Sequence, residues 1–218
     1  AVAARLRAEV DTVIHAAASV LFDERIDHAV ETNALAARRA VVFTRALKKP
    51  SILTLVSTAY VNGSRTGRIL EELPPPGSSP ARLMGRSQAA TLDVERELRE
   101  IDAATRALQA RASGEAMRRR FRAEADKARA AGQADEPTEA LVETARERWL
   151  TRELVGEGMR RARRHGWHDV YTFTKAMGEE LAVAARGDLP VAIVRPSIIE
   201  SSFSEPEPGW INGLKVAD

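Results

Sequence analysis

The stretch VDTVIHAAA at residues 10–18 decides the fold, because it is a short β-branched and apolar run that ends in small residues. β-Branched side chains favour extended structure, and a nearly continuous apolar run is typical of a parallel strand covered on both faces. A second such run, SILTLV, follows at residues 51–56. Between them the sequence predicts a helix that begins near Asp23, a good N-cap residue, and ends near Lys49, before Pro50. Strand, helix and strand together make a right-handed βαβ unit.

The last part of the chain again alternates a predicted helix with a predicted strand, as the first part does. A helix is expected to begin near Asp169, and the run LPVAIVRP at residues 189–196 has the composition of another parallel strand. Asn62 and Gly63 are a turn signal after the second strand, and the proline-rich residues 73–80 are expected to form a loop. The sequence therefore predicts an α/β protein with a parallel sheet.

The middle of the chain, residues 86–165, is dense in Arg, Glu and Ala and is expected to be a helical insertion. Breaks at Gly132 and Pro137 divide it into two or three helices, the last of which is expected to reach Arg164, with Gly166 just beyond its end. The first helix carries a heptad-like apolar stripe made of Val94, Leu98, Ile101 and Leu108.

Composition excludes several classes of protein. The 218 residues include no cysteine, so disulfide scaffolds, Cys-ligated metals and thiol catalysis are excluded, and no metal site is expected. The formal net charge is only +2 and aromatic residues make up 5%, so we expect no nucleic-acid partner. No apolar run approaches the roughly 18–20 residues that cross a bilayer. We therefore expect a cytoplasmic protein, with peripheral membrane attachment as the alternative.

Tyr171 and Lys175 lie four residues apart in the run YTFTK, which places a phenol and an ammonium on one face of the predicted helix. A tyrosine with a pKa near 10 is a poor proton donor at neutral pH, and a nearby positive charge stabilises the phenolate. At about 4 Å and an effective dielectric constant of about 20, this attraction is worth roughly 4 kcal/mol, or about three pKa units. The pair predicts a general acid, although a core tyrosine beside a surface lysine has the same spacing.

Further candidate residues follow the predicted strands. Ser57 and Thr58 end the second strand, at the edge where open parallel sheets bind ligands, and a hydroxyl there can hydrogen-bond a substrate carbonyl oxygen. His15 and the small residues after it end the first strand, and RPSII at residues 195–199 ends the third. Asn33 lies in the middle of the predicted helix, where its cost in helix propensity indicates a hydrogen-bonding role.

Taken in their order along the chain, these motifs resemble those of the extended short-chain dehydrogenase/reductase superfamily. Within it they most closely resemble those of the fatty acyl-CoA reductase (male-sterility-like) family. The stretches that carry the resemblance are VIHAAASV at 13–20, ETN at 31–33, VSTAYVNG at 56–63, YTFTK at 171–175, IVRPSIIES at 193–201, and EP and PGWI at 205–206 and 208–211. The resemblance implies a partial Rossmann-like (doubly wound) parallel sheet with a long α-helical insertion. The NAD(P)-binding domain would comprise residues 1–85 and 166–218, and the insertion residues 86–165.

Members of this family begin with a strand and a Gly-rich turn that meets the cofactor pyrophosphate at a helix N-terminus. Gly156-Glu157-Gly158 does not supply that turn, because it lies within a charged helical run. Members also continue well past the position of Asp218. We therefore expect the chain to be an internal fragment that carries the catalytic half and is inactive alone.

The resemblance also implies roles for the candidate residues. Tyr171 would donate a proton to the substrate carbonyl, while Lys175 would hold the cofactor ribose and lower the pKa of Tyr171. Thr58, or alternatively Ser57, would hydrogen-bond the carbonyl, and Asn33 would help position Lys175 through a water. The cofactor would be NADPH, with NADH as the alternative, and would lie against Ala16, Ala17, Pro196 and Ile198.

The implied function is NADPH-dependent reduction of a long-chain acyl-CoA thioester to a fatty aldehyde or alcohol. Two alternatives remain open at this point. One is a thioester reductase that acts on carrier-bound acyl groups with the same Tyr–Lys chemistry. The other is a non-catalytic helical interaction module on a degenerate reductase scaffold. The heptad-like stripe motivates the second alternative, and it also motivates a homodimer formed through the insertion.

Overall fold

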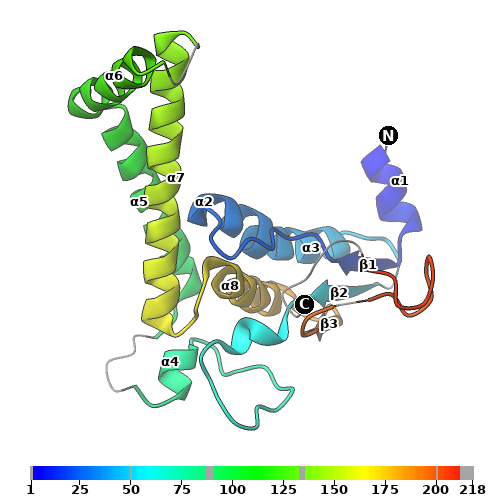
Figure 1. The fold of residues 1–218 in the computed structure, drawn as a ribbon. Helices are drawn as coiled ribbons and strands as arrows, with labels where there is room; N and C mark the ends of the chain where they lie inside the picture. The colour runs from blue at the N-terminus through cyan, green and yellow to red at the C-terminus, as the bar shows by residue number, and fades with distance from the viewer. Residues whose placement is uncertain (1, 50, 87–90, 133–135, 200, 212–218) are drawn as a thin grey trace.

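The computed structural model of the chain describes residues 2–49, 51–86, 91–132, 136–199 and 201–211. A parallel sheet with the strand order β1-β2-β3 lies at one end of the molecule (Figure 1); its strands are β1 (Thr12–His15), β2 (Ile52–Val56) and β3 (Val191–Val194). The α/β class and all three predicted strands are confirmed. Pro50, which was expected to stop the helix before β2, lies outside the described residues.

The helical elements follow one another along the chain as α1 (Val2–Glu9), α2 (Ile26–Ala29), the π-helix η1 (Val30–Leu35), α3 (Ala36–Arg45), the 3-10 helix η2 (Ala59–Asn62), α4 (Pro80–Leu83), α5 (Val94–Ala112), α6 (Glu115–Ala130), α7 (Thr138–His165) and α8 (Val170–Ala185). The predicted C-terminal end of α7 and the predicted start of α8 are confirmed. Gly166 follows α7 in the left-handed conformation, with φ of 95°, and Asp169 caps α8 by accepting a hydrogen bond from the Thr172 amide at 2.7 Å. Among the described residues, no helix is both long and apolar enough to span a membrane.

One face of the sheet is covered by α3 and α8. Alternate side chains of the central strand point into this layer, where Leu53 and Leu55 are buried. On the opposite face Ile14 and Val194 are 67% and 49% exposed. The prediction that the strands are covered on both faces is therefore wrong for the described part of the chain, in which helices pack on one face only.

The helical run after β1 differs from the prediction at its start, in its middle and at its end, which lies at Arg45 and not near Lys49. It begins at Ile26 with Arg25 in the N-cap position, so Asp23 does not cap it. Glu24 instead accepts a hydrogen bond from the Arg25 amide, at 3.0 Å. The middle of the run, η1, is π-helical and carries Asn33. Single π-turns inside α-helices often occur at functional sites.

Helix α8 approaches η1 closely at Gly178, because a Cβ atom at this position would overlap the Asn33 carbonyl oxygen. Gly178→Ala is therefore expected to lower the free energy of unfolding in urea by about 1–3 kcal/mol. Gly156→Ala in α7 is the matched control, because the nearest atom to its Cβ would be Arg160 Nη1, at 3.8 Å. This control should be neutral or stabilising by up to about 1 kcal/mol. Equal stabilities of the two variants would contradict the close approach.

Helices α5, α6 and α7 form an arm that extends away from the sheet (Figure 1). The apolar core of the arm continues through Trp149 and Leu154 to Met177 of α8. The predicted stripe packs into this core, because Val94 and Ile101 are buried, and Leu98 and Leu108 are half-buried against it. The stripe therefore packs against helices of the same chain. It is not exposed as the surface from which the dimer was predicted. The division into a domain and an insertion remains a prediction.

Candidate active site

The carboxyl end of β2 and the first turn of α8 bring two predicted side chains together. Thr58 is the N-cap of η2, and its Oγ1 accepts a hydrogen bond from the Tyr60 amide at 3.2 Å. The Thr58 hydroxyl also lies close enough to the phenol of Tyr171 to lower the pKa of this phenol. Since a hydroxyl both accepts and donates, Thr58 can accept from the main chain and still donate its own proton.

The phenol of Tyr171 has a pKa above its ordinary value. Burial is the main cause, the Thr58 interaction partly opposes it, and the negative charge of Asp169 adds to it. Lys175 is not among the groups that shift this pKa. The expectation that its ammonium lowers the pKa of Tyr171 is therefore wrong in this structure, where the ammonium is bound elsewhere.

The side chain of Lys175 is only 4% exposed, and its Nζ donates a hydrogen bond to the Val56 carbonyl at 2.7 Å. Burial lowers the pKa of Lys175, and the carboxylate of Glu179 partly opposes this shift. The pKa of His15 is also lowered, first by burial and then by the charge of Lys175. The ammonium therefore lies at the carboxyl ends of β1 and β2, where parallel sheets bind ligands.

Asn33 has partners other than the expected lysine. Its Oδ1 accepts from the Ser19 amide at 2.9 Å, and its Nδ2 donates to the Ser19 carbonyl and to Thr174 Oγ1, both at 3.1 Å. These direct contacts join the loop after β1 to α8, and the expectation that Asn33 positions Lys175 through a water stays a prediction. Sequence reasoning missed Thr174 and Ser19. No local signal connects Thr174 with a partner 141 residues away.

Besides Lys175, the residues expected to contact the cofactor all follow the carboxyl ends of β1 and β3: Ala16, Ala17, Pro196 and Ile198. The two alanines are exposed and carry only a methyl group, Pro196 is half-buried, and Ile198 is 44% exposed. Ser57 lies at the same edge. Its Oγ is buried without a hydrogen-bond partner among the described residues. Small side chains, an orphaned hydroxyl and a buried ammonium at one edge fit a nicotinamide dinucleotide.

A buried ion pair lies one turn beyond Lys175. The carboxylate of Glu179, 5% exposed, accepts from the Arg195 guanidinium at 3.1 and 2.6 Å. The same guanidinium donates to the Glu72 carbonyl at 3.2 Å, so it ties β3 to the loop after η2. Arg195 stands in the motif RPSII, but the sequence pattern gave it no partner.

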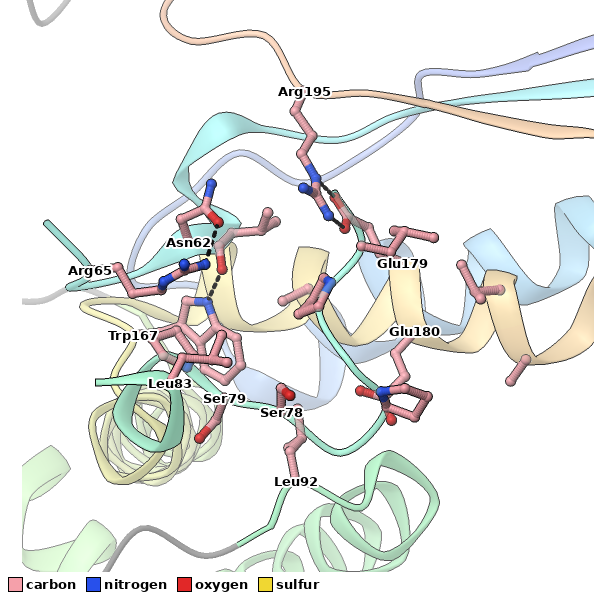
Figure 2. Close-up of a pocket in the computed structure, with 18 residues that line it drawn as sticks. Asn62, Arg65, Ser78, Ser79, Leu83, Leu92, Trp167, Glu179, Glu180 and Arg195 are labelled. Carbon is pink, nitrogen blue, oxygen red and sulfur yellow. Dashed lines mark hydrogen bonds and ion pairs between the residues drawn. The ribbon is translucent and has the colours of Figure 1, made fainter. Parts of the chain in front are cut away.

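A cavity of about 180 Å³ lies against a different face of α8, between that helix, η2, α4 and the proline-rich loop (Figure 2). Trp167 forms one wall, and its indole Nε1 donates to the Val61 carbonyl at 2.7 Å. Tyr171, Lys175 and Thr58 do not line this cavity. It is therefore distinct from the cluster of predicted catalytic groups.

Several fatty acyl-CoA reductases are similar in sequence to this chain. The chain is 35% identical over 214 residues to fatty acyl-CoA reductase 2, chloroplastic, from Arabidopsis thaliana, which aligns with 96% of this chain and 28% of that protein. It is 35% identical over 210 residues to the alcohol-forming fatty acyl-CoA reductase from Simmondsia chinensis, covering 96% of this chain and 35% of that protein. Fatty acyl-CoA reductase 1 from Xenopus laevis is 27% identical over 205 residues, covering 94% of this chain and 28% of that protein. The chain thus spans about a third of the length of these relatives.

The family model described as male sterility protein matches residues 1–218, which is the whole chain. Its match is consistent with the parallel sheet of the α/β fold. The protein therefore belongs to the male sterility protein family of NAD(P)-binding domains, with fatty acyl-CoA reductases among its relatives.

Proposed function

We propose that this chain supplies the catalytic groups for the NADPH-dependent reduction of a fatty acyl-CoA thioester to a fatty aldehyde or alcohol. The observation that carries the proposal is the position of the Tyr171 phenol, which lies near Thr58 and one helical turn from the buried Lys175. The names of the curated relatives favour a coenzyme A ester over a carrier-bound acyl group as the substrate.

Two donors would act on the thioester carbonyl oxygen. Thr58 would donate a hydrogen bond that strengthens as negative charge develops on this oxygen, and Tyr171 would transfer its proton to it. The phenol is protonated at neutral pH, but its raised pKa makes it a weaker acid than a free tyrosine, so the transfer would depend on the negative charge that develops on the carbonyl oxygen. Burial of the phenol also limits the water that could compete for its proton.

Lys175 would hold the cofactor. An ammonium carries three N–H donors, and one of them is directed to the Val56 carbonyl, which leaves the others for ribose hydroxyls. When bound, NADPH supplies the hydride that reduces the thioester carbon, and cleavage of the carbon–sulfur bond then releases the aldehyde and the coenzyme A thiol. Ala16 and Ala17 would let the cofactor approach the backbone after β1, and Asn33 would hold this loop through Ser19.

The Thr58 hydroxyl provides a direct test of the proposal in the full-length protein that carries this chain. Thr58→Val is expected to lower kcat/KM for palmitoyl-CoA by about 10²–10³-fold, because it removes one donor to the developing oxyanion. Thr58→Ser keeps a hydroxyl and is expected to retain activity within about tenfold of wild type. The measurement is acyl-CoA-dependent oxidation of NADPH. Undiminished turnover by Thr58→Val would contradict the role of this residue.

A further inference from the structure

We infer that the cavity beside α8 binds the distal part of an unbranched alkyl chain (Figure 2). The inference rests on the proposed function in one respect, because the main source of such a chain would be the acyl group of the proposed substrate. It concerns a face of α8 that carries none of the proposed catalytic groups. The inference follows from the lining of the cavity, from its polar partners and from its position.

The walls of the cavity are mostly apolar and already packed. Val61, Leu92 and Trp167 are 8%, 2% and 4% exposed, so these parts of the wall are held in place by the core. Ala176 and Val183 of α8 add small and branched side chains to the same surface. A volume of about 180 Å³ exceeds the space that a single water needs by about an order of magnitude. Preformed apolar cavities of this kind are typical of sites for small apolar ligands.

Most polar groups in the lining are already paired with the protein. Glu179 binds Arg195; burial raises the pKa of Glu180, and the nearby Gly77 amide partly opposes this shift. The Ser79 hydroxyl accepts from the Arg82 amide at 3.3 Å and caps α4. A polar ligand would find few free partners here and would leave its own polar groups unpaired, which is costly in a buried site. An alkyl chain needs no such partners.

Arg65 is a charged residue of the lining that has no ion-pair partner among the described residues. Its guanidinium is half-buried and donates to Asn62 Oδ1 at 3.4 Å. This guanidinium can bind the carboxylate of a free fatty acid, which is the second source of an unbranched chain. The two sources share the same apolar recognition and differ in the head group.

The cavity is placed to receive a chain whose carbonyl end lies at the proposed catalytic groups. Val61 and Asn62 belong to η2, which begins directly after Thr58, and Ala176 follows Lys175 in α8. The cavity and the catalytic cluster are therefore formed by different faces of the same two elements. The inference requires a long acyl chain to run beside η2 from one to the other, and a short chain would not reach the cavity.

Binding of the fluorescent fatty acid cis-parinaric acid tests the inference without any need for turnover. Ala176→Leu and Val183→Phe fill the cavity from two positions, so that one variant remains informative if the other fails to fold. Ala123→Leu, at an exposed position of α6, is the control for added bulk. Each filled variant should bind the probe at least about tenfold more weakly than wild type, because burial of several methylene groups is lost. The control should bind within about twofold of wild type. Absence of saturable binding to wild type, or equal binding by the folded variants, would overturn the inference.

Competition and turnover separate this inference from the proposed function. Palmitoyl-CoA is expected to displace the probe and octanoyl-CoA to displace it poorly. Displacement by palmitate but not by palmitoyl-CoA would overturn the assignment to the substrate chain. In the full-length protein, the filled variants should lose at least about tenfold in kcat/KM for palmitoyl-CoA and change little for octanoyl-CoA. If wild type reduces no acyl-CoA of any length but still binds the probe in the cavity, the proposed function fails and the alkyl-chain site stands.

Discussion

Tyr171→Phe is expected to lower kcat for acyl-CoA-dependent NADPH oxidation by about 10²–10⁴-fold in the full-length protein, because it removes the proposed proton donor. Binding of NADPH is expected to remain nearly unchanged, since the phenol is not proposed to hold the cofactor. The fold should also persist, because the ring of Tyr171 keeps its edge contact with Phe22, whose centroid lies 6.0 Å away. The measurements are steady-state kinetics and a cofactor titration on the same preparation.

The second tyrosine of the chain provides the control. Tyr60 is 49% exposed and contributes its amide, not its phenol, to the interaction with Thr58. Tyr60→Phe is therefore expected to leave turnover within about twofold of wild type. Retained turnover by Tyr171→Phe would refute the role of this residue as proton donor, and a loss of cofactor binding would show that its effect is indirect.

The carboxylate of Glu97 is expected to make the largest single contribution to stability among the ion pairs described here. Its side chain is 2% exposed, and it binds Arg161 Nη1 at 2.7 Å and His165 Nε2 at 3.1 Å. Replacement by Ala leaves a guanidinium partly buried with fewer partners. Glu97→Ala is therefore expected to lower the free energy of unfolding by about 3–5 kcal/mol. Glu139→Ala, which removes an exposed partner of Arg122, should cost at most about 1 kcal/mol.

The same carboxylate predicts how stability depends on pH. Burial by itself raises the pKa of Glu97, but hydrogen bonds from His165 and Arg161 outweigh it and lower this pKa from 4.5 to about 2. The folded state therefore holds the ionised form more strongly than the unfolded state does. The resulting contribution of about 3 kcal/mol is present above about pH 4.5 and is lost as the pH falls through about 2.

Urea unfolding of wild type and Glu97→Gln between pH 6 and pH 3 measures this contribution. The free energy of unfolding of wild type should fall faster with acid than that of the variant, because the variant has no carboxylate to protonate at this position. Parallel pH curves for the two proteins would contradict the lowered pKa of Glu97.

Features that depend on local sequence were predicted well. The three strands follow from short β-branched runs, and the end of α7 follows from a glycine in the left-handed conformation. The approach of Tyr171 to Thr58 could also be anticipated, because the carboxyl end of a parallel strand and the helix before the next strand meet at one edge of a sheet.

Features that depend on distant contacts were not predicted. The side of the helical run on which Asn33 lies depends on a π-turn. Its hydrogen bond to Thr174 joins residues that the long arm separates in sequence. The direction of the Lys175 ammonium depends on a main-chain carbonyl of β2, which no spacing rule identifies. The stripe on α5 showed which side of the helix is apolar, but not that its partner would be the same chain.

The continuous core beneath the arm limits how this protein can be redesigned. Leu154 and Trp149 of α7 belong to the apolar cluster that buries Met177, so the arm and the helix that carries Tyr171 are stabilised together. A shortened variant that joins residue 86 directly to residue 166 would strip the underside of α8 of its cover. The arm therefore cannot be shortened or moved to another protein by itself. The apolar surface of α8 that it covers would have to be redesigned at the same time.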